Sequence, residues 1–91
     1  MTDALEPLRR RFLARARDDL AAIKAHLAGE TLASDELRLL VHRLAGAGGT
    51  FGYQDISQSA GEAEDEVLQE RDPRPALLRL QDVLTQHVAS S

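Results

Sequence analysis

Apolar residues recur at steps of three and four along four separate stretches of this chain, with polar residues between them. At about 100° per residue, this spacing places the apolar side chains on one side of an α-helix. We therefore predict helices over about residues 4–28, 35–51, 54–70 and 73–88. No stretch shows the alternation of a half-buried strand. The pattern predicts an all-α protein, an antiparallel up-down four-helix bundle with residues 1–91 in a single domain. The apolar positions are Leu5, Leu8, Phe12, Ala16, Leu20, Ile23 and Leu27, then Leu37, Leu40, Val41, Leu44, Gly48 and Phe51, then Ile56, Ala60, Ala63 and Val67, and finally Ala76, Leu77, Leu80, Val83, Leu84 and His87 or Val88.

Residues that favour helix ends bracket these stretches. Asp3 and the glutamate three residues later form a capping-box arrangement for the first helix, and Gly29 stands where a C-terminal cap belongs. Ser34 is expected to cap the second helix. Asp72 is expected to cap the fourth helix, with Pro73 at its first position.

Composition narrows the class of protein. The 91 residues support one domain with a modest core, which is aliphatic because only 3% of the residues are aromatic. A formal net charge of −4 argues against nucleic acid as the main partner, and the absence of cysteine excludes disulfides and thiolate zinc sites. No apolar run approaches the roughly 18 residues of a membrane span, and the first residues lack the pattern of a signal peptide. We therefore expect a cytoplasmic monomer without a membrane partner.

The stretch around His42 departs from what folding alone requires of a helix. Counted from the middle of the apolar stripe, His42 lies about 140° around the helix, so its imidazole should face water. Gly46 and Gly49 lie on the same outer side, and each glycine costs a helix about 1 kcal/mol relative to alanine. Gly48 lies in the stripe, where it lets a neighbouring helix approach closely. The two outer glycines leave space beside the ring for a phosphoryl group and the partner that delivers it.

This stretch resembles the histidine-containing phosphotransfer (HPt) domain of two-component phosphorelays. The family has a leucine two residues after its histidine, a glycine four residues after it and another glycine ten residues after it. Leu44, Gly46 and Gly52 follow His42 at these distances. The resemblance covers about residues 37–68. It continues through an apolar residue, a small residue, a small or apolar residue and a Glu or Gln, which here are Ile56, Ala60, Ala63 and Glu64.

The resemblance implies that His42 accepts a phosphoryl group from an aspartate of one receiver domain and passes it to another. It also places Glu64 where a carboxylate orients the imidazole from the neighbouring helix. A carboxylate that accepts a hydrogen bond from Nδ1–H leaves Nε2 as the attacking atom. The alternative for Glu64 is a solvated acid among several others on its helix.

The implied partners are receiver (response-regulator) domains, a hybrid histidine kinase, or both. We expect no cofactor and no metal on this chain, with Mg²⁺ in the receiver's acidic pocket. The sequence lacks a Gly-rich nucleotide loop and ATP-binding boxes, so we expect a phosphotransfer intermediate without autokinase activity.

Ala45 departs from the family, which has a lysine at this position. The ammonium group that would lie one helical turn from the phosphoryl group is therefore missing. Arg43 or Arg38 is a candidate to replace its charge, although Arg43 lies about 100° around the helix from the ring. Arg38 and Leu39 are candidates for partner docking. The missing lysine also keeps open a non-catalytic HPt-like adaptor that binds a receiver without phosphotransfer.

The two other histidines, His26 and His87, lie near the ends of the first and fourth helices and are expected to be structural or surface residues. Four-helix bundles also house di-iron carboxylate sites, but the Glu-x-x-His motifs that these sites require are missing from the sequence.

Overall fold

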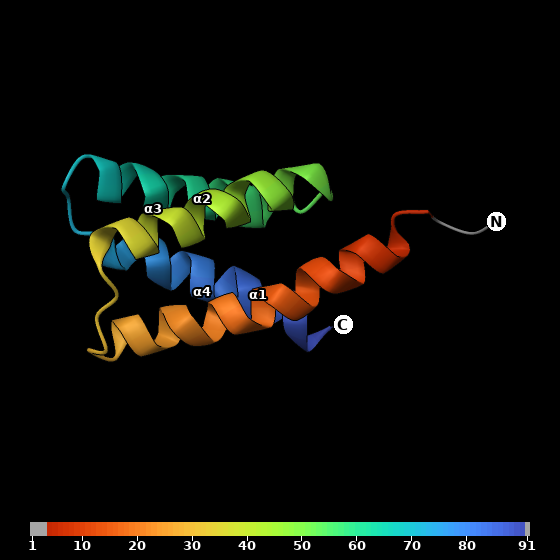
Figure 1. Cartoon of the computed structure of the whole chain (residues 1–91), viewed down its shortest axis with the longest axis horizontal. Coiled ribbons are helices and arrows are strands. Elements are labelled where there is room, and N and C mark those ends of the chain that lie inside the picture. The colour runs from red at the N-terminus through yellow and green to blue at the C-terminus, as the bar shows by residue number, and fades with distance from the viewer. Residues whose placement is uncertain (1–3, 91) are drawn as a thin grey trace.

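The computed structural model describes residues 4–90, and most of them lie in four helices. The helices are α1 (Glu6–Leu27), α2 (Ser34–Thr50), α3 (Gln54–Leu68) and α4 (Arg74–Ala89). The α1–α2 and α3–α4 connections lie at one end of the molecule, whereas the α2–α3 connection lies at the other end with the start of α1 and the end of α4 (Figure 1). The all-α prediction is confirmed, and each helix begins and ends within two residues of its predicted limits. The alternating directions fit an antiparallel up-down bundle.

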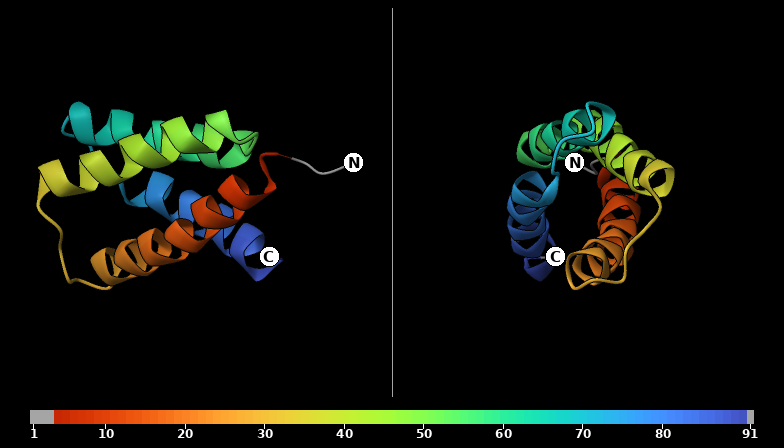
Figure 2. Two further views of the ribbon diagram at one scale, coloured as in Figure 1. Left: turned by 45° about the vertical axis from the view of Figure 1, so that its right-hand side comes forward. Right: turned by 90° about the vertical axis from the view of Figure 1, so that its left-hand side faces the viewer.

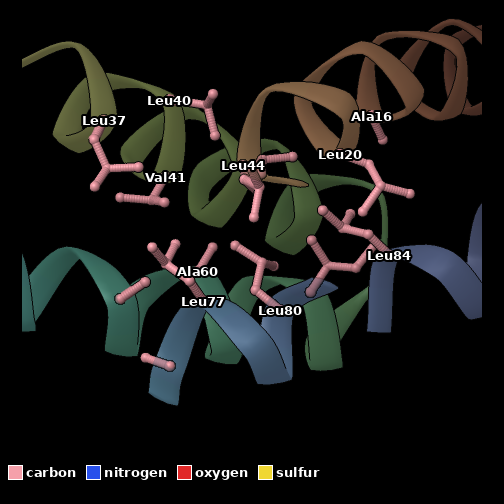
Figure 3. Close-up of a cluster of buried hydrophobic side chains, with 14 of the residues drawn as sticks. Ala16, Leu20, Leu37, Leu40, Val41, Leu44, Ala60, Leu77, Leu80 and Leu84 are labelled. Carbon is pink, nitrogen blue, oxygen red and sulfur yellow. The ribbon is translucent and has the colours of Figure 1, made fainter. Parts of the chain in front are cut away.

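The core lies between all four helices, which surround a common centre when viewed along the long axis (Figure 2). α2 packs most extensively on α3, and α4 packs on both α3 and α1, whereas α1 touches α2 over only a few residues. Aliphatic side chains from the four predicted stripes meet in this core (Figure 3). Its largest fully buried side chains are Ile23, Val41, Ile56, Leu77, Leu80 and Leu84.

The first turn of α1 differs from the predicted core. The stripe predicts Leu5 and Leu8 as buried, but both are exposed. α1 has 22 residues and the other helices have 15 to 17. Its first turn therefore extends past the end of the α2–α3 pair (Figure 1). Phe12 is the first buried residue of α1.

Three helices end in the same backbone motif. The residue after the C-cap has a positive φ, and it is Gly29 (107°) after α1, Gly52 (87°) after α2 and Glu70 (56°) after α3. In each case its N–H donates to the carbonyl three residues back, and the next N–H donates to the carbonyl five residues back. This is the Schellman arrangement, and it confirms the predicted cap at Gly29. Glu70 adopts this conformation with a side chain, which costs about 1 kcal/mol.

The start of α2 corrects one prediction. Ala33 rather than Ser34 is its N-cap, and no side chain makes a capping hydrogen bond there. Leu32 packs against the core, and its N–H donates to Nδ1 of His26 at 3.1 Å. The helix begins at Ser34, one residue earlier than predicted.

The start of α4 is also displaced by one residue. Pro73 is the N-cap and not the first helical residue. Asp72 still serves the helix end, since its Oδ1 accepts a hydrogen bond from the N–H of Arg74 at 3.0 Å. The capping box predicted for α1 depends on Asp3, which lies outside the described residues.

Candidate functional site

His42 lies on the outer side of α2, because its neighbours Val41 and Leu44 turn their side chains into the core. The His42 side chain is 63% exposed. The predicted exposure of the imidazole is therefore confirmed.

The ring of His42 is held by a carboxylate from the neighbouring helix. Oε2 of Glu64 on α3 lies 2.8 Å from Nδ1 of His42, and the Glu64 side chain is only 17% exposed. An ionised carboxylate can only accept a hydrogen bond, so Nδ1 must carry the hydrogen. In the neutral ring this leaves the lone pair on Nε2, which is the atom farther from the backbone. The arrangement provides an oriented nucleophilic nitrogen on an exposed surface.

The three glycines of α2 have three different surroundings. A Cβ at Gly46 would meet nothing within 4 Å, so the space beside the ring is open as predicted. A Cβ at Gly48 would lie 3.1 Å from the backbone nitrogen of Ser57, which confirms its role in close helix packing. Gly49 corrects the prediction, because a Cβ there would lie 3.3 Å from Oγ of Ser57. Gly49 is therefore partly explained by packing against α3.

Two hydroxyl groups brace this glycine-rich turn. Oγ of Ser57 donates across the helix interface to the carbonyl of Ala45 at 2.8 Å. Oγ1 of Thr50 donates within α2 to the carbonyl of Gly46 at 3.0 Å. Ser57 is not one of the site residues predicted from the sequence. Its spacing of seven residues before Glu64, two helical turns on the same face, is the signal that points to it.

The arginine nearest to His42 in sequence is directed elsewhere. Arg43 lines a groove of about 290 Å³ between α1 and α2, together with Asp19 and Arg15. Burial raises the pKa of Asp19 above its ordinary value, although Arg43 and Arg15 act to lower it. Arg43 thus lies beside a carboxylate of α1, and the structure does not bring it to the ring of His42.

The other predicted surroundings of the ring lie on α2 itself. Ala45, at the position of the family's lysine, is half-buried and packs against the core. Arg38, one turn before His42, is half-buried, and Leu39 is exposed. These placements keep Arg38 and Leu39 on the helix surface that carries the ring.

His87 forms a second histidine–carboxylate pair, which joins α4 to α3. Its Nε2 lies 2.9 Å from Oδ2 of Asp55, and its ring packs edge-on against Tyr53 with centroids 4.9 Å apart. Burial raises the pKa of Asp55, but hydrogen bonds from His87 and from the N–H of Ile56 outweigh burial and leave this pKa below its ordinary value. His87 is therefore a structural residue, as predicted.

His26 is structural as well, since its Nδ1 accepts the hydrogen bond that fixes Leu32 before α2. Within residues 4–90, no three histidine or acidic side chains are grouped closely enough to hold a metal ion.

A comparison with protein families matched the Hpt domain over residues 7–90. The chain therefore belongs to the Hpt domain family, whose members take part in two-component phosphorelays. No curated protein and no solved structure matched the chain. None of the helices in the described part of the chain has the length and apolar character needed to cross a membrane.

Proposed function

We propose that this chain is a monomeric cytoplasmic phosphotransfer domain that carries a phosphoryl group on Nε2 of His42 between the aspartates of receiver domains. The observation that supports it most directly is the 2.8 Å hydrogen bond between Nδ1 of His42 and Glu64, on an exposed ring beside the open backbone of Gly46. Arg38 and Leu39 then belong to the surface on which the receiver docks.

The chemistry requires little from the chain beyond position. The lone pair of Nε2 attacks the phosphorus of the receiver's aspartyl phosphate, the N–P bond forms, and the P–O bond to the aspartate breaks. Phosphoryl transfer passes through a loose transition state, so alignment of the attacking nitrogen supplies most of the rate. Glu64 keeps the hydrogen on Nδ1 and stabilises the ring as positive charge develops on it. A Mg²⁺ ion held by the receiver's carboxylates would screen the charge on the phosphoryl oxygens. The reverse reaction delivers the group to a second receiver.

A labelling experiment tests this proposal. Incubation with ³²P-labelled phospho-receiver domains should give acid-labile, alkali-stable label on the wild type and none on His42→Gln. The sequence has three histidines, so His26→Gln and His87→Gln are matched controls that should keep the label. Label that persists on His42→Gln would place the acceptor elsewhere.

Ala45 favours a second candidate, a non-catalytic adaptor that binds a receiver without taking its phosphoryl group. Without the family's lysine, no ammonium group lies one turn after His42 to stabilise phosphohistidine. The adaptor predicts that receivers bind the wild type and His42→Gln equally well and leave no label on either protein. Titration of a fluorescently labelled receiver, run beside the labelling experiment, separates the two candidates.

A further inference from the structure

Ser57 lies at a close approach between α2 and α3. Its backbone nitrogen would lie 3.1 Å from a Cβ at Gly48, and its Oγ would lie 3.3 Å from a Cβ at Gly49. The same Oγ donates to the carbonyl of Ala45 at 2.8 Å. Two glycines thus admit the Ser57 residue against α2, and its hydroxyl bonds to a backbone group three residues after His42.

The contact between Ser57 and the glycines of α2 lies in the same α2–α3 interface as the His42–Glu64 pair. Ser57 precedes Glu64 by seven residues on α3, and Gly49 follows His42 by seven residues on α2. Seven residues are about two helical turns, or roughly 10.5 Å, and α2 and α3 run in opposite directions. The Ser57–Gly49 contact and the His42–Glu64 hydrogen bond therefore lie on one face of the helix pair. A shift or rotation of α2 at one contact is transmitted to the other.

Residues 46–49 of α2, which include three glycines, need a contact with another helix to fix their position. Glycine has the weakest helix propensity after proline, so residues 46–49 alone hold the rotation of α2 poorly. The Ala45 carbonyl accepts from Ser57 in addition to the i+4 N–H of its own helix, which fixes the turn against α3. An error of about 1 Å in the position of a reacting group can cost about a hundredfold in rate.

We propose that Ser57 is a positioning residue for phosphotransfer, whose hydroxyl sets the register and rotation of α2 so that Nδ1–H of His42 meets Glu64. This role rests on the function proposed for His42. It also explains why two glycines stand side by side in α2, since Gly48 and Gly49 together form the slot that Ser57 occupies.

The test compares Ser57→Ala with Ser59→Ala. Oγ of Ser59 donates to the carbonyl of Asp55 at 2.7 Å within α3, so Ser59→Ala loses a similar hydroxyl–carbonyl bond without touching α2. The first measurement is ¹⁵N NMR of the His42 ring, which reports whether Nδ1 or Nε2 carries the hydrogen. The second is the rate of phosphorylation by phosphoramidate, a small donor whose P–N bond breaks with release of ammonia when imidazole attacks. Urea unfolding confirms that each variant is folded.

Ser57→Ala should shift the His42 ring toward the Nε2–H tautomer and slow its phosphorylation about tenfold, whereas Ser59→Ala should match the wild type in both measurements. Equal tautomers and rates in Ser57→Ala and wild type would overturn the proposal. Equal changes in both variants would also overturn it, because they would show a general effect of losing a hydroxyl.

A double substitution separates positioning from stability. A Cβ added at Gly49 would lie 3.3 Å from Oγ of Ser57, and Ser57→Ala removes that oxygen. Gly49→Ala combined with Ser57→Ala therefore replaces a helical glycine without this close contact, and it should raise the urea midpoint above that of Ser57→Ala. The rate and tautomer should remain those of Ser57→Ala. If the double variant regains the wild-type rate together with the higher stability, Ser57 only supports the fold.

The two proposals fail in different ways. If neither phosphoramidate nor phospho-receivers label the wild type, phosphotransfer by His42 is refuted. The tautomer of the ring would still decide whether Ser57 positions it.

Discussion

The two histidine–carboxylate pairs of this protein have similar hydrogen-bond lengths but reversed exposure. At His42 the ring is 63% exposed and its partner Glu64 is 17% exposed. At His87 the ring is 29% exposed and its partner Asp55 is 50% exposed. The hydrogen-bonded ring nitrogen also differs, since Glu64 is bonded to Nδ1 of His42 and Asp55 is bonded to Nε2 of His87.

On the function proposed for His42, this difference separates a reactive pair from a structural one. In the first pair a shielded carboxylate holds the ring by the nitrogen next to the backbone, and the outer nitrogen keeps its lone pair for a partner. In the second pair the outer nitrogen is occupied, and Tyr53 packs against the ring. The hydrogen bond alone therefore does not define a site. Its placement on the ring and the burial of each partner do.

The largest expected difference between the pairs is in rate. Glu64→Ala should slow phosphorylation of His42 by phosphoramidate about a hundredfold, because the ring loses the group that fixes its orientation and tautomer. Asp55→Ala should leave this rate within about twofold of the wild type, since the Asp55 carboxylate is hydrogen-bonded to His87 and to the N–H of Ile56 rather than to His42. Time courses by ³¹P NMR measure both variants. Equal slowing by the two substitutions would contradict the different roles given to the two histidine–carboxylate pairs.

Stability should show the opposite ranking. His87→Ala removes the hydrogen bond to Asp55 and the ring contact with Tyr53, and should lower the free energy of unfolding by about 2 kcal/mol. His42→Ala should change it by less than about 0.5 kcal/mol, because its ring is largely solvated. Urea denaturation at pH 7 checks both values. A larger loss at His42 would mean that its pair also supports the fold.

The backbone beside His42 offers a sharper comparison of activity with stability. Gly46→Ala should raise the free energy of unfolding by about 1 kcal/mol, because alanine favours a helix and its Cβ meets nothing within 4 Å. It should slow transfer from a phospho-receiver, since the methyl group occupies space beside the ring. Gly48→Ala is the control and should lower stability, because its Cβ would lie 3.1 Å from a backbone atom of α3. Faster transfer by Gly46→Ala would contradict the proposed use of this space.

The smallest expected effect is the pH dependence of the structural pair. The pKa of Asp55 is below its ordinary value, so the folded state favours its ionised form. Its contribution to stability is therefore full above about pH 4 and is lost as the pH falls through the folded-state pKa. Wild type should exceed Asp55→Asn by about 0.5 kcal/mol at pH 6, and the gap should close in acid. Urea titrations of both proteins from pH 6 to pH 3 measure this difference in stability. A difference that widens in acid would contradict a lowered pKa of Asp55.

The spacing of apolar residues within each helix was sufficient to predict which way a residue of that helix faces. It placed His42 outward and Gly48 inward, and it indicated that Arg43 lies off to one side of the ring. The family resemblance supplied Glu64, and the structure confirms that it reaches the ring.

Contacts between helices could not be predicted in the same way. Ser57, Asp55 and the surroundings of Gly49 depend on which turn of one helix meets which turn of the next, and the sequence period within a helix carries no such register. Leu5 and Leu8 continue the apolar stripe of α1, but burial also requires a partner helix of equal length.

Glu70 shows that the chain has not been driven to its highest stability. It occupies a left-handed position that α1 and α2 give to glycine at their ends, so Glu70→Gly should relieve strain there. The same molecule keeps three glycines inside α2, the helix that carries His42. Glu70→Gly is therefore a change in a connection that should raise stability and leave α2 and its glycines untouched.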